Sequence, residues 1–196
     1  MPSGRTHDRI TLWTLPVLAG LTLAIARNST ITLIICAGFL FGGLMFGPDL
    51  DVLSIHYKRW GWLRWIWIPY RGSMKHRSIW SHGPIIGTTV RVLYLSVWLT
   101  FLGLLGLALI NEVLRVGWTW NGIGQSLQRS FQRYTIEWLL FCLGLELGAL
   151  SHYVADWGIS AQKRYKTQGW KAVLPPAPKA KKRTTRRSKG QRQSKR

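Results

Sequence analysis

Residues 31–47 read ITLIICAGFLFGGLMFG, an apolar run without a charged residue, and Pro48-Asp49-Leu50-Asp51 follows at once. A helix of about 17–25 residues, rising about 1.5 Å per residue, crosses about 30 Å of hydrocarbon. The run is therefore long enough for one membrane crossing. Its abrupt end predicts that Asp49 and Asp51 lie where a helix leaves the bilayer.

Three more apolar runs have comparable length, at residues 10–26, 85–110 and 136–155. The last two contain one charge each, Arg91 and Glu146. The sequence thus predicts an all-α polytopic membrane protein with four transmembrane helices.

The first two runs are separated only by Arg27-Asn28-Ser29-Thr30, which predicts a tight helical hairpin. A competing interpretation of the first run is a cleavable signal peptide, because a basic start and Ala24-Ile25-Ala26 flank it. A second run after so short a gap favours a membrane helix instead.

The composition agrees with a membrane protein that carries a basic end. The 196 residues include 27 Lys or Arg, 7 Asp or Glu and 12 Trp, with a net charge of +20 and 47% hydrophobic residues. This balance excludes an acidic disordered chain, a disulfide-rich secreted module and a conventional soluble enzyme. We expect a four-helix membrane domain over residues 1–160, and a basic linker with a disordered tail over residues 161–196.

Four crossings place both termini on one side of the membrane. Outside the apolar runs, that side carries 22 Lys or Arg and the opposite side carries 4. The excess of positive charge predicts that both termini are cytoplasmic.

Two connections have the character of membrane interfaces. Residues 111–135 have apolar side chains at helical spacing, which predicts an interfacial helix. Residues 58–80 are rich in tryptophan, lysine and arginine, which predicts an anchor at headgroup level or, alternatively, a platform for a lipid substrate. The tryptophans concerned are Trp60, Trp62, Trp65, Trp67 and Trp80.

The basic end from Lys179 to Arg196 has no apolar periodicity and is predicted to be disordered. It could bind anionic lipid headgroups, at about 1 kcal/mol per basic residue near the surface. Contact with RNA or the ribosome is a second possibility, but the lack of aromatic residues argues against base stacking and sequence specificity. The simplest alternative is a solvated tail that sets the topology.

All the histidines and aspartates fall on the predicted cytoplasmic side, close to the four helix ends. His152 and Asp156 are four residues apart, so both project from one helix face, and Asp49-x-Asp51 places two carboxylates in irregular backbone. This pattern predicts a divalent metal site, with zinc favoured. The candidate ligands are His7, Asp49, His76, His82, His152 and Asp156. We expect His56 to be an interfacial residue and Asp8 to favour the first helical turn.

The chain resembles an uncharacterised family of membrane metal-binding proteins common in photosynthetic bacteria. The resemblance covers about residues 1–160. It rests on the ordered motifs Gly4-Arg5-Thr6-His7-Asp8, Gly47-Pro48-Asp49-Leu50-Asp51, His76-Arg77-Ser78, Ser81-His82-Gly83-Pro84 and His152-x-x-x-Asp156. It implies a metal and a bacterial inner, or thylakoid, membrane.

More distantly, the motifs are similar to those of small membrane-bound metal-dependent hydrolases, and through these to zinc-dependent phospholipase C and P1-type nucleases. Gly83 departs from that pattern, where such hydrolases usually have Ser. If the likeness extends to activity, Asp51 or His76 completes the ligand shell and Arg77 stabilises a phosphate oxyanion.

Two function classes follow. One is a metal-dependent hydrolase of a phosphoester or lipid-like substrate at the cytoplasmic membrane surface, and the other is a non-catalytic metal-binding or scaffold protein. A transporter is less favoured, because the candidate ligands gather at one face rather than near the midplane.

A further expectation concerns the two charges within the apolar runs. Arg91 and Glu146 lie at similar depths below the same surface, and an unpaired Arg there costs about 2.5 kcal/mol or more. We therefore expect them to form a buried ion pair. The alternative is that Arg91 reaches the headgroups while Glu146 is protonated or turns toward the metal site.

Overall fold

A computed structural model describes residues 4–76 and 78–170, and these residues contain helices and no strand. The chain divides into two compact units, Met1–Ile159 and Ser160–Arg196. Two predictions, an anion-stabilising role for Arg77 and a disordered tail over residues 179–196, concern positions outside the described residues.

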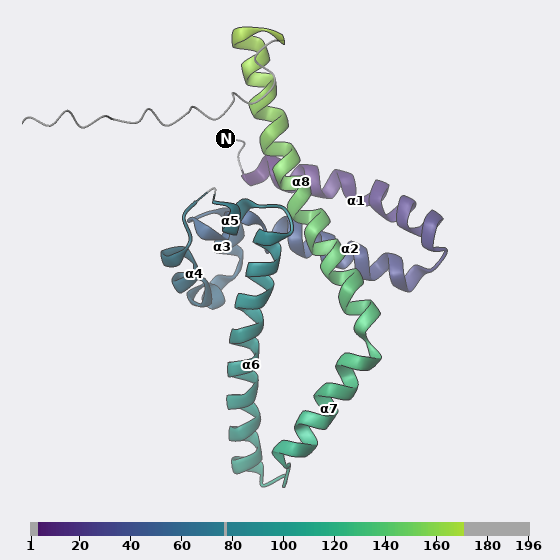
Figure 1. The fold of residues 1–196 in the computed structure, drawn as a ribbon, viewed down its shortest axis with the longest axis vertical. Helices are drawn as coiled ribbons and strands as arrows, with labels where there is room; N and C mark the ends of the chain where they lie inside the picture. Colours follow the sequence, from purple (N-terminus) through teal and green to yellow (C-terminus); the bar gives the residue numbers. More distant parts are fainter. Residues whose placement is uncertain (1–3, 77, 171–196) are drawn as a thin grey trace, which may run out of the picture. The chain divides into compact units, whose positions relative to one another are not determined.

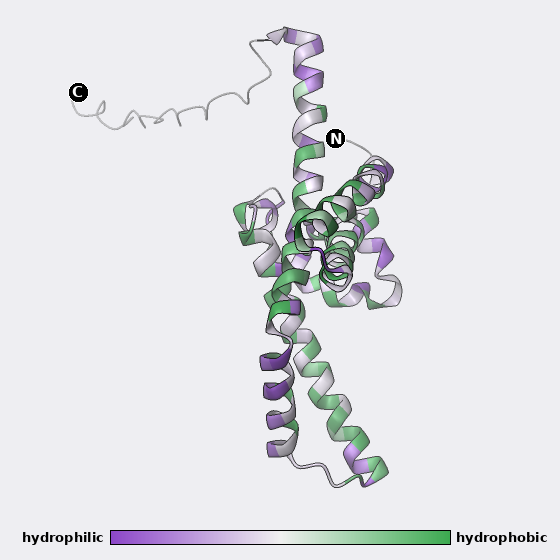
Figure 2. Cartoon of the chain, turned by 90° about the vertical axis from the view of Figure 1, so that its right-hand side faces the viewer, coloured by the Kyte–Doolittle hydropathy of each residue, from purple (hydrophilic) through white to green (hydrophobic). Residues whose placement is uncertain are grey.

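The all-α prediction is confirmed, with four helices long and apolar enough to cross a membrane. Within the described residues these spans are α1 (Gly4–Ala26), the stretch Ser29–Asp51 that begins with α2 (Ser29–Leu44), α6 (Ile86–Leu114) and α8 (Thr135–Gln168) (Figure 1). The predicted helix between the last two is α7 (Trp120–Arg133). Figure 2 shows α6 apolar over most of its length, while α7 carries strongly hydrophilic residues. Insertion into a membrane stays a prediction.

Helices α1 and α2 form the predicted hairpin (Figure 1). The turn is short because Arg27 adopts a left-handed conformation, with φ 47°, and Asn28 caps α2. The Asn28 side-chain oxygen accepts a hydrogen bond from the Ile31 amide at 3.1 Å. The hairpin returns the chain to the level of His7, where α2 ends.

Helices α2 and α8 pack through glycines at close range. A Cβ atom on Gly38 would collide with the carbonyl oxygen of Phe141, and one on Gly144 with that of Ile35. The two backbones are therefore in direct contact, as small residues four positions apart allow. This close approach fixes α8, and hence His152, relative to the end of α2.

Five short helices connect α2 to α6. They are η1 (Pro48–Asp51), α3 (Ile55–Arg59), η2 (Gly61–Trp67), α4 (Ile68–Ser73) and α5 (Ile79–His82). Their buried core consists of Phe46, Leu50, Tyr57, Trp67 and Tyr70, together with Leu145 of α8. This core holds η1 and α5 at the ends of the long helices.

The prediction that all five tryptophans of this connection are interfacial anchors is wrong for Trp67. Its side chain is fully buried, with its ring against those of Phe46 and Tyr70. Trp62 and Trp80 remain exposed, as an anchor requires. The apolar surface of Trp67 is removed from water by the short helices themselves.

The predicted ion pair between Arg91 and Glu146 is also wrong: these two described residues bond to other groups. Arg91 is fully buried, and its Nη1 donates to the Ser81 carbonyl at 2.8 Å while its Nη2 donates to Thr88 Oγ1 at 3.0 Å. Glu146 Oε1 accepts a hydrogen bond from the Ile85 amide at 2.9 Å. The first turn of a helix leaves amides without helical partners, and Glu146 satisfies one just before α6 begins.

Candidate metal centre

The structure brings together every described residue of the predicted ligand set. His7 comes from the start of α1, Asp49 and Asp51 from η1, and His152 and Asp156 from one face of α8. The remaining two are His76, which precedes α5, and His82, which ends it. The three elements that supply most of these residues are fixed by the hairpin, the glycine contacts and the buried core.

One half of the cluster joins α1, α8 and η1. His7 Nε2 lies 3.3 Å from Asp156 Oδ1, and Asp156 Oδ2 lies 3.7 Å from His152 Nε2. His152 Nε2 in turn lies 3.4 Å from Asp49 Oδ2. Two imidazole nitrogens and two carboxylates therefore converge on one small volume.

The other half extends from the second oxygen of Asp49. Asp49 Oδ1 lies 3.4 Å from His82 Nε2, and His82 Nδ1 lies 3.6 Å from Asp51 Oδ2. Asp51 Oδ1 is 3.0 Å from His76 Nδ1, which is hydrogen-bonding distance. Histidines and aspartates thus alternate through the whole cluster, and Asp49 joins its two halves.

The residues fit a divalent ion better than a set of hydrogen bonds. His82 Nε2 and His152 Nε2 are buried and have no hydrogen-bond partner among the described residues. Their distances of 3.4 Å to Asp49 exceed the usual 2.7–3.2 Å of an N–H···O bond. Ligands about 2.0–2.2 Å from a tetrahedral ion are about 3.3–3.6 Å apart, which matches these contacts.

Exposure differs across the cluster and indicates where small molecules reach it. The side chains of Asp51 and His152 are 0% and 2% exposed, whereas that of His76 is 33% exposed. Asp49 and Asp156 are 25% exposed. Solvent therefore reaches the cluster past His76 and the carboxylates of Asp49 and Asp156. His152 of α8 lies at the buried side of the cluster.

A hydrogen-bond relay orients His82. Ser81 Oγ lies 2.9 Å from His82 Nδ1, and the Ser81 carbonyl accepts the bond from Arg91 Nη1. With Nδ1 engaged by the hydroxyl, the Nε2 atom is directed to Asp49. This arrangement is typical of a metal-ligating histidine, whose second ring nitrogen is held by a neighbouring group.

His56 belongs to the wall of the cluster, and its prediction as an interfacial residue is wrong. Its side chain is 2% exposed, and its ring centroid lies 5.4 Å from that of His152. Burial, followed by the neighbouring His152, lowers the pKa of His56 to about 4, so the ring is neutral near pH 7. The ring packs closely against Gly47, where a Cβ atom would collide with it, and no local sequence pattern indicates this contact.

Asp8 also departs from its prediction. Helix α1 begins at Gly4, so Asp8 lies beyond its first turn. Its carboxylate pairs with Arg59, whose Nη1 donates to Asp8 Oδ1 at 2.9 Å and also to the Leu44 carbonyl. Asp8 therefore ties α1 to α3 beside the cluster rather than joining it.

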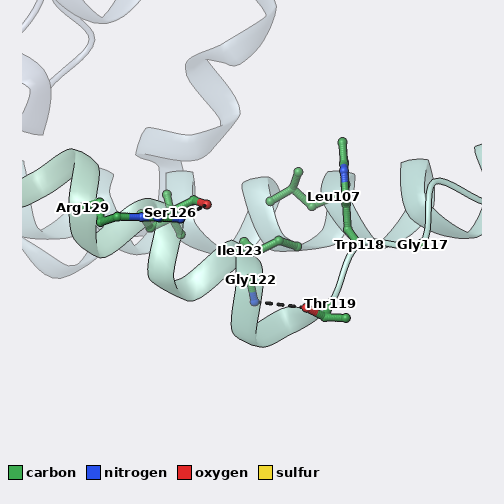
Figure 3. A pocket seen from close by; sticks show the side chains of 9 residues that line it. Leu107, Gly117, Trp118, Thr119, Gly122, Ile123, Ser126 and Arg129 are labelled. Atoms are coloured by element: carbon green, nitrogen blue, oxygen red, sulfur yellow. Dashed lines mark hydrogen bonds between the residues drawn. The ribbon is translucent and has the colours of Figure 1, made fainter.

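A cavity of about 600 Å³ lies far along α6 from the cluster, between the end of α6 and α7. Figure 3 shows Leu107 and Trp118 bordering it, with Thr119 Oγ1 accepting a hydrogen bond from the Gly122 amide. Its lining contains no His, Asp, Glu or Cys. It is therefore not a candidate for the chemistry of the cluster.

Comparison with known proteins agrees with the cluster. The family model described as "Uncharacterized metal-binding protein" matches residues 2–166. A protein of Aquifex aeolicus (strain VF5), named only "Uncharacterized protein", is 39% identical over 59 residues, which are 30% of this chain and 41% of that protein. The match thus spans less than half the length of this relative. No solved structure matches the chain.

Proposed function

The chain belongs to this family of metal-binding proteins, and we propose that it is an integral membrane hydrolase that depends on divalent metal ions, with zinc preferred. Its substrate is a phosphoester or a lipid-like molecule at the cytoplasmic membrane surface. The observation that carries the proposal is the position of Asp49, whose two oxygens face two buried histidine nitrogens without hydrogen-bond partners.

The two halves of the cluster would each hold one divalent ion, with Asp49 contributing an oxygen to either half. The first ligand set is His7, His152, Asp156 and one oxygen of Asp49. The second is the other oxygen of Asp49 with Asp51, His76 and His82. Paired ions that share ligands are typical of phosphatases and nucleases, in which they hold the attacking and leaving oxygens of a displacement.

A bound divalent ion would supply a water of lowered pKa and a Lewis acid for a phosphoryl oxygen. The residues of the chain have separate tasks. Asp51 accepts a hydrogen bond from His76 Nδ1, which leaves the Nε2 of the more exposed ring free to bind or to take a proton. Ser81 orients His82, and the buried ring of His152 excludes water from the inner side of the cluster. Arg77, next to His76, remains the proposed stabiliser of the phosphate oxygens.

The ends of α1, α2 and α6 supply or border the cluster, and α8 passes it after its apolar run, which supports a site at a membrane surface. Substrates in that layer are lipid headgroups and their phosphoesters. The basic tail would add attraction for anionic lipids on the same side.

The test uses the full chain purified in detergent. Its metal content is measured, followed by hydrolysis of a soluble phosphodiester and of phospholipid vesicles. We expect Asp49→Asn to lower both metal content and hydrolysis, because its bridging charge is lost, whereas Asp8→Asn keeps both. Bound metal without hydrolysis of either substrate would support the non-catalytic alternative, and the absence of bound metal would reject both.

A further inference from the structure

Two cavities adjoin each other between α6 and α8 and share Val92 and Cys142 in their linings. The lower one, of about 530 Å³, is bordered almost wholly by apolar side chains of α2, α6, α7 and α8, including Phe131 and Trp138. The upper one, of about 340 Å³, is also mainly apolar, with Ile85 and Leu93 in its lining, but Thr88, Thr89 and Glu146 border it as well. Together they form an elongated recess with a mainly apolar lining and with Glu146 at one end.

The Glu146 end of this recess is the end nearer the metal centre along α6 and α8. Ile85 is the third residue after His82, and Glu146 is about 9 Å along α8 from His152. Glu146 Oε1 is occupied by the Ile85 amide, whereas its Oε2 is buried and has no hydrogen-bond partner among the described residues. A hydroxyl group that enters the upper cavity would find an acceptor there.

We propose that this recess, called the acyl recess below, binds one acyl chain of a membrane lipid whose polar head lies at the His/Asp cluster. The apolar lining matches the methylenes of such an amphiphile, and a glycerol hydroxyl at the upper end would have Glu146 as its acceptor. Burying apolar surface against the lining supplies the affinity. The placement of the headgroup rests on the proposed function, whereas the occupancy of the recess by an acyl chain does not.

The test compares two neighbouring substitutions on α6. Ser96 lines the lower cavity, whereas Val97 is 70% exposed and lines neither cavity. We expect the full chain, extracted from membranes in mild detergent, to retain about one phospholipid in native mass spectrometry. Ser96→Trp should lower the retained lipid by about tenfold or more, the equivalent of about 1.4 kcal/mol. Val97→Trp should retain it.

A second measurement does not depend on a bulky substitution. The chain has two cysteines, so Cys36→Ser leaves Cys142 in the wall of both cavities as the single thiol. We expect a maleimide to label Cys142 slowly in the lipid-containing protein and at least about tenfold faster after delipidation. Equal labelling rates, or equal lipid retention by wild type and Ser96→Trp, would overturn the acyl recess and indicate annular lipid only.

Metal content separates this proposal from the one before it. Ser96→Trp leaves the ligand sets intact, so it should keep the wild-type metal content. If lipid is retained but no metal and no hydrolysis are found, the hydrolase proposal fails and the acyl recess stands. If metal is bound but the recess retains no lipid, the acyl recess fails alone.

Discussion

His7 and His152 stack on each other, with ring centroids 3.8 Å apart and planes inclined by 14°. One ring comes from the first turn of α1 and the other from α8, so the contact closes the site between distant parts of the chain. The Nε2 atoms of both rings face Asp156. Helix α1 is therefore part of the proposed metal centre and not only a neighbour of it.

The first prediction concerns that contact. His7→Ala should remove about one equivalent of metal, because the first ligand set loses a nitrogen that water replaces poorly. His152→Ala combined with Asp156→Ala should remove most of the metal of that first set and leave the second set occupied. Elemental analysis of purified protein measures both. Asp8→Asn is the matched control on α1, and equal metal in His7→Ala and wild type would exclude His7 as a ligand.

The relay through Ser81 gives the second prediction. Ser81→Ala removes the hydroxyl that holds His82 Nδ1 but leaves the imidazole in place. Metal affinity should fall by about 10–100-fold, the usual effect of losing such a supporting group. Competition with a metal chelator measures it, and Ser73→Ala on α4 serves as the control because the Ser73 hydroxyl donates to the Pro69 carbonyl of its own helix. Unchanged affinity would show that the relay does not hold the ligand.

The sequence predicted the long helices and the converging ligands because their signals are local. Uninterrupted apolar runs give helix length, and the four-residue spacing gives the shared face of His152 and Asp156. The place of His56 could not be predicted in the same way. It depends on the close packing of α3 against Gly47, which no periodicity records.

Arg91 shows a second limit of the sequence. Its depth and charge predicted an ion pair with Glu146. In the structure, backbone groups take the place of the partner charge for both side chains. The Ser81 carbonyl and the Ile85 amide each needed a partner in the irregular segment before α6, and such groups are costly to leave unpaired. That segment is defined only once the short helices have packed around Trp67.

The third prediction follows from this arrangement. Arg91→Met should destabilise the protein by about 1–3 kcal/mol, because the buried Ser81 carbonyl loses its donor. Glu146→Gln keeps an acceptor for the Ile85 amide and should cost less. Because the two side chains have separate partners, their effects should add within about 0.5 kcal/mol in thermal unfolding of the purified protein. A coupling energy larger than this between the two substitutions would contradict the separate partners and support the predicted ion pair.

The fourth prediction is topological. If α1, α2, α6 and α8 all cross the membrane, reporters fused at Ala26 and Trp118 should be outside the cytoplasm and a C-terminal reporter inside it. Alkaline phosphatase and fluorescent-protein fusions measure the two states. A C-terminus outside the cytoplasm would contradict both the orientation and a cytoplasmic metal centre.

The contact between α2 and α8 gives the fifth prediction. Gly144→Ala places a methyl group against the carbonyl oxygen of Ile35, which is backbone and cannot move aside. The two helices must separate, which should cost about 1–3 kcal/mol, as overpacking usually does. Gly103→Ala on α6 meets nothing within 4 Å and should be neutral or slightly stabilising. Because α8 carries His152 and Asp156, Gly144→Ala should also weaken metal binding, measured by chelator competition, while Gly103→Ala should not. Equal stability and equal metal affinity in the two variants would show that the glycine contact does not hold the site together.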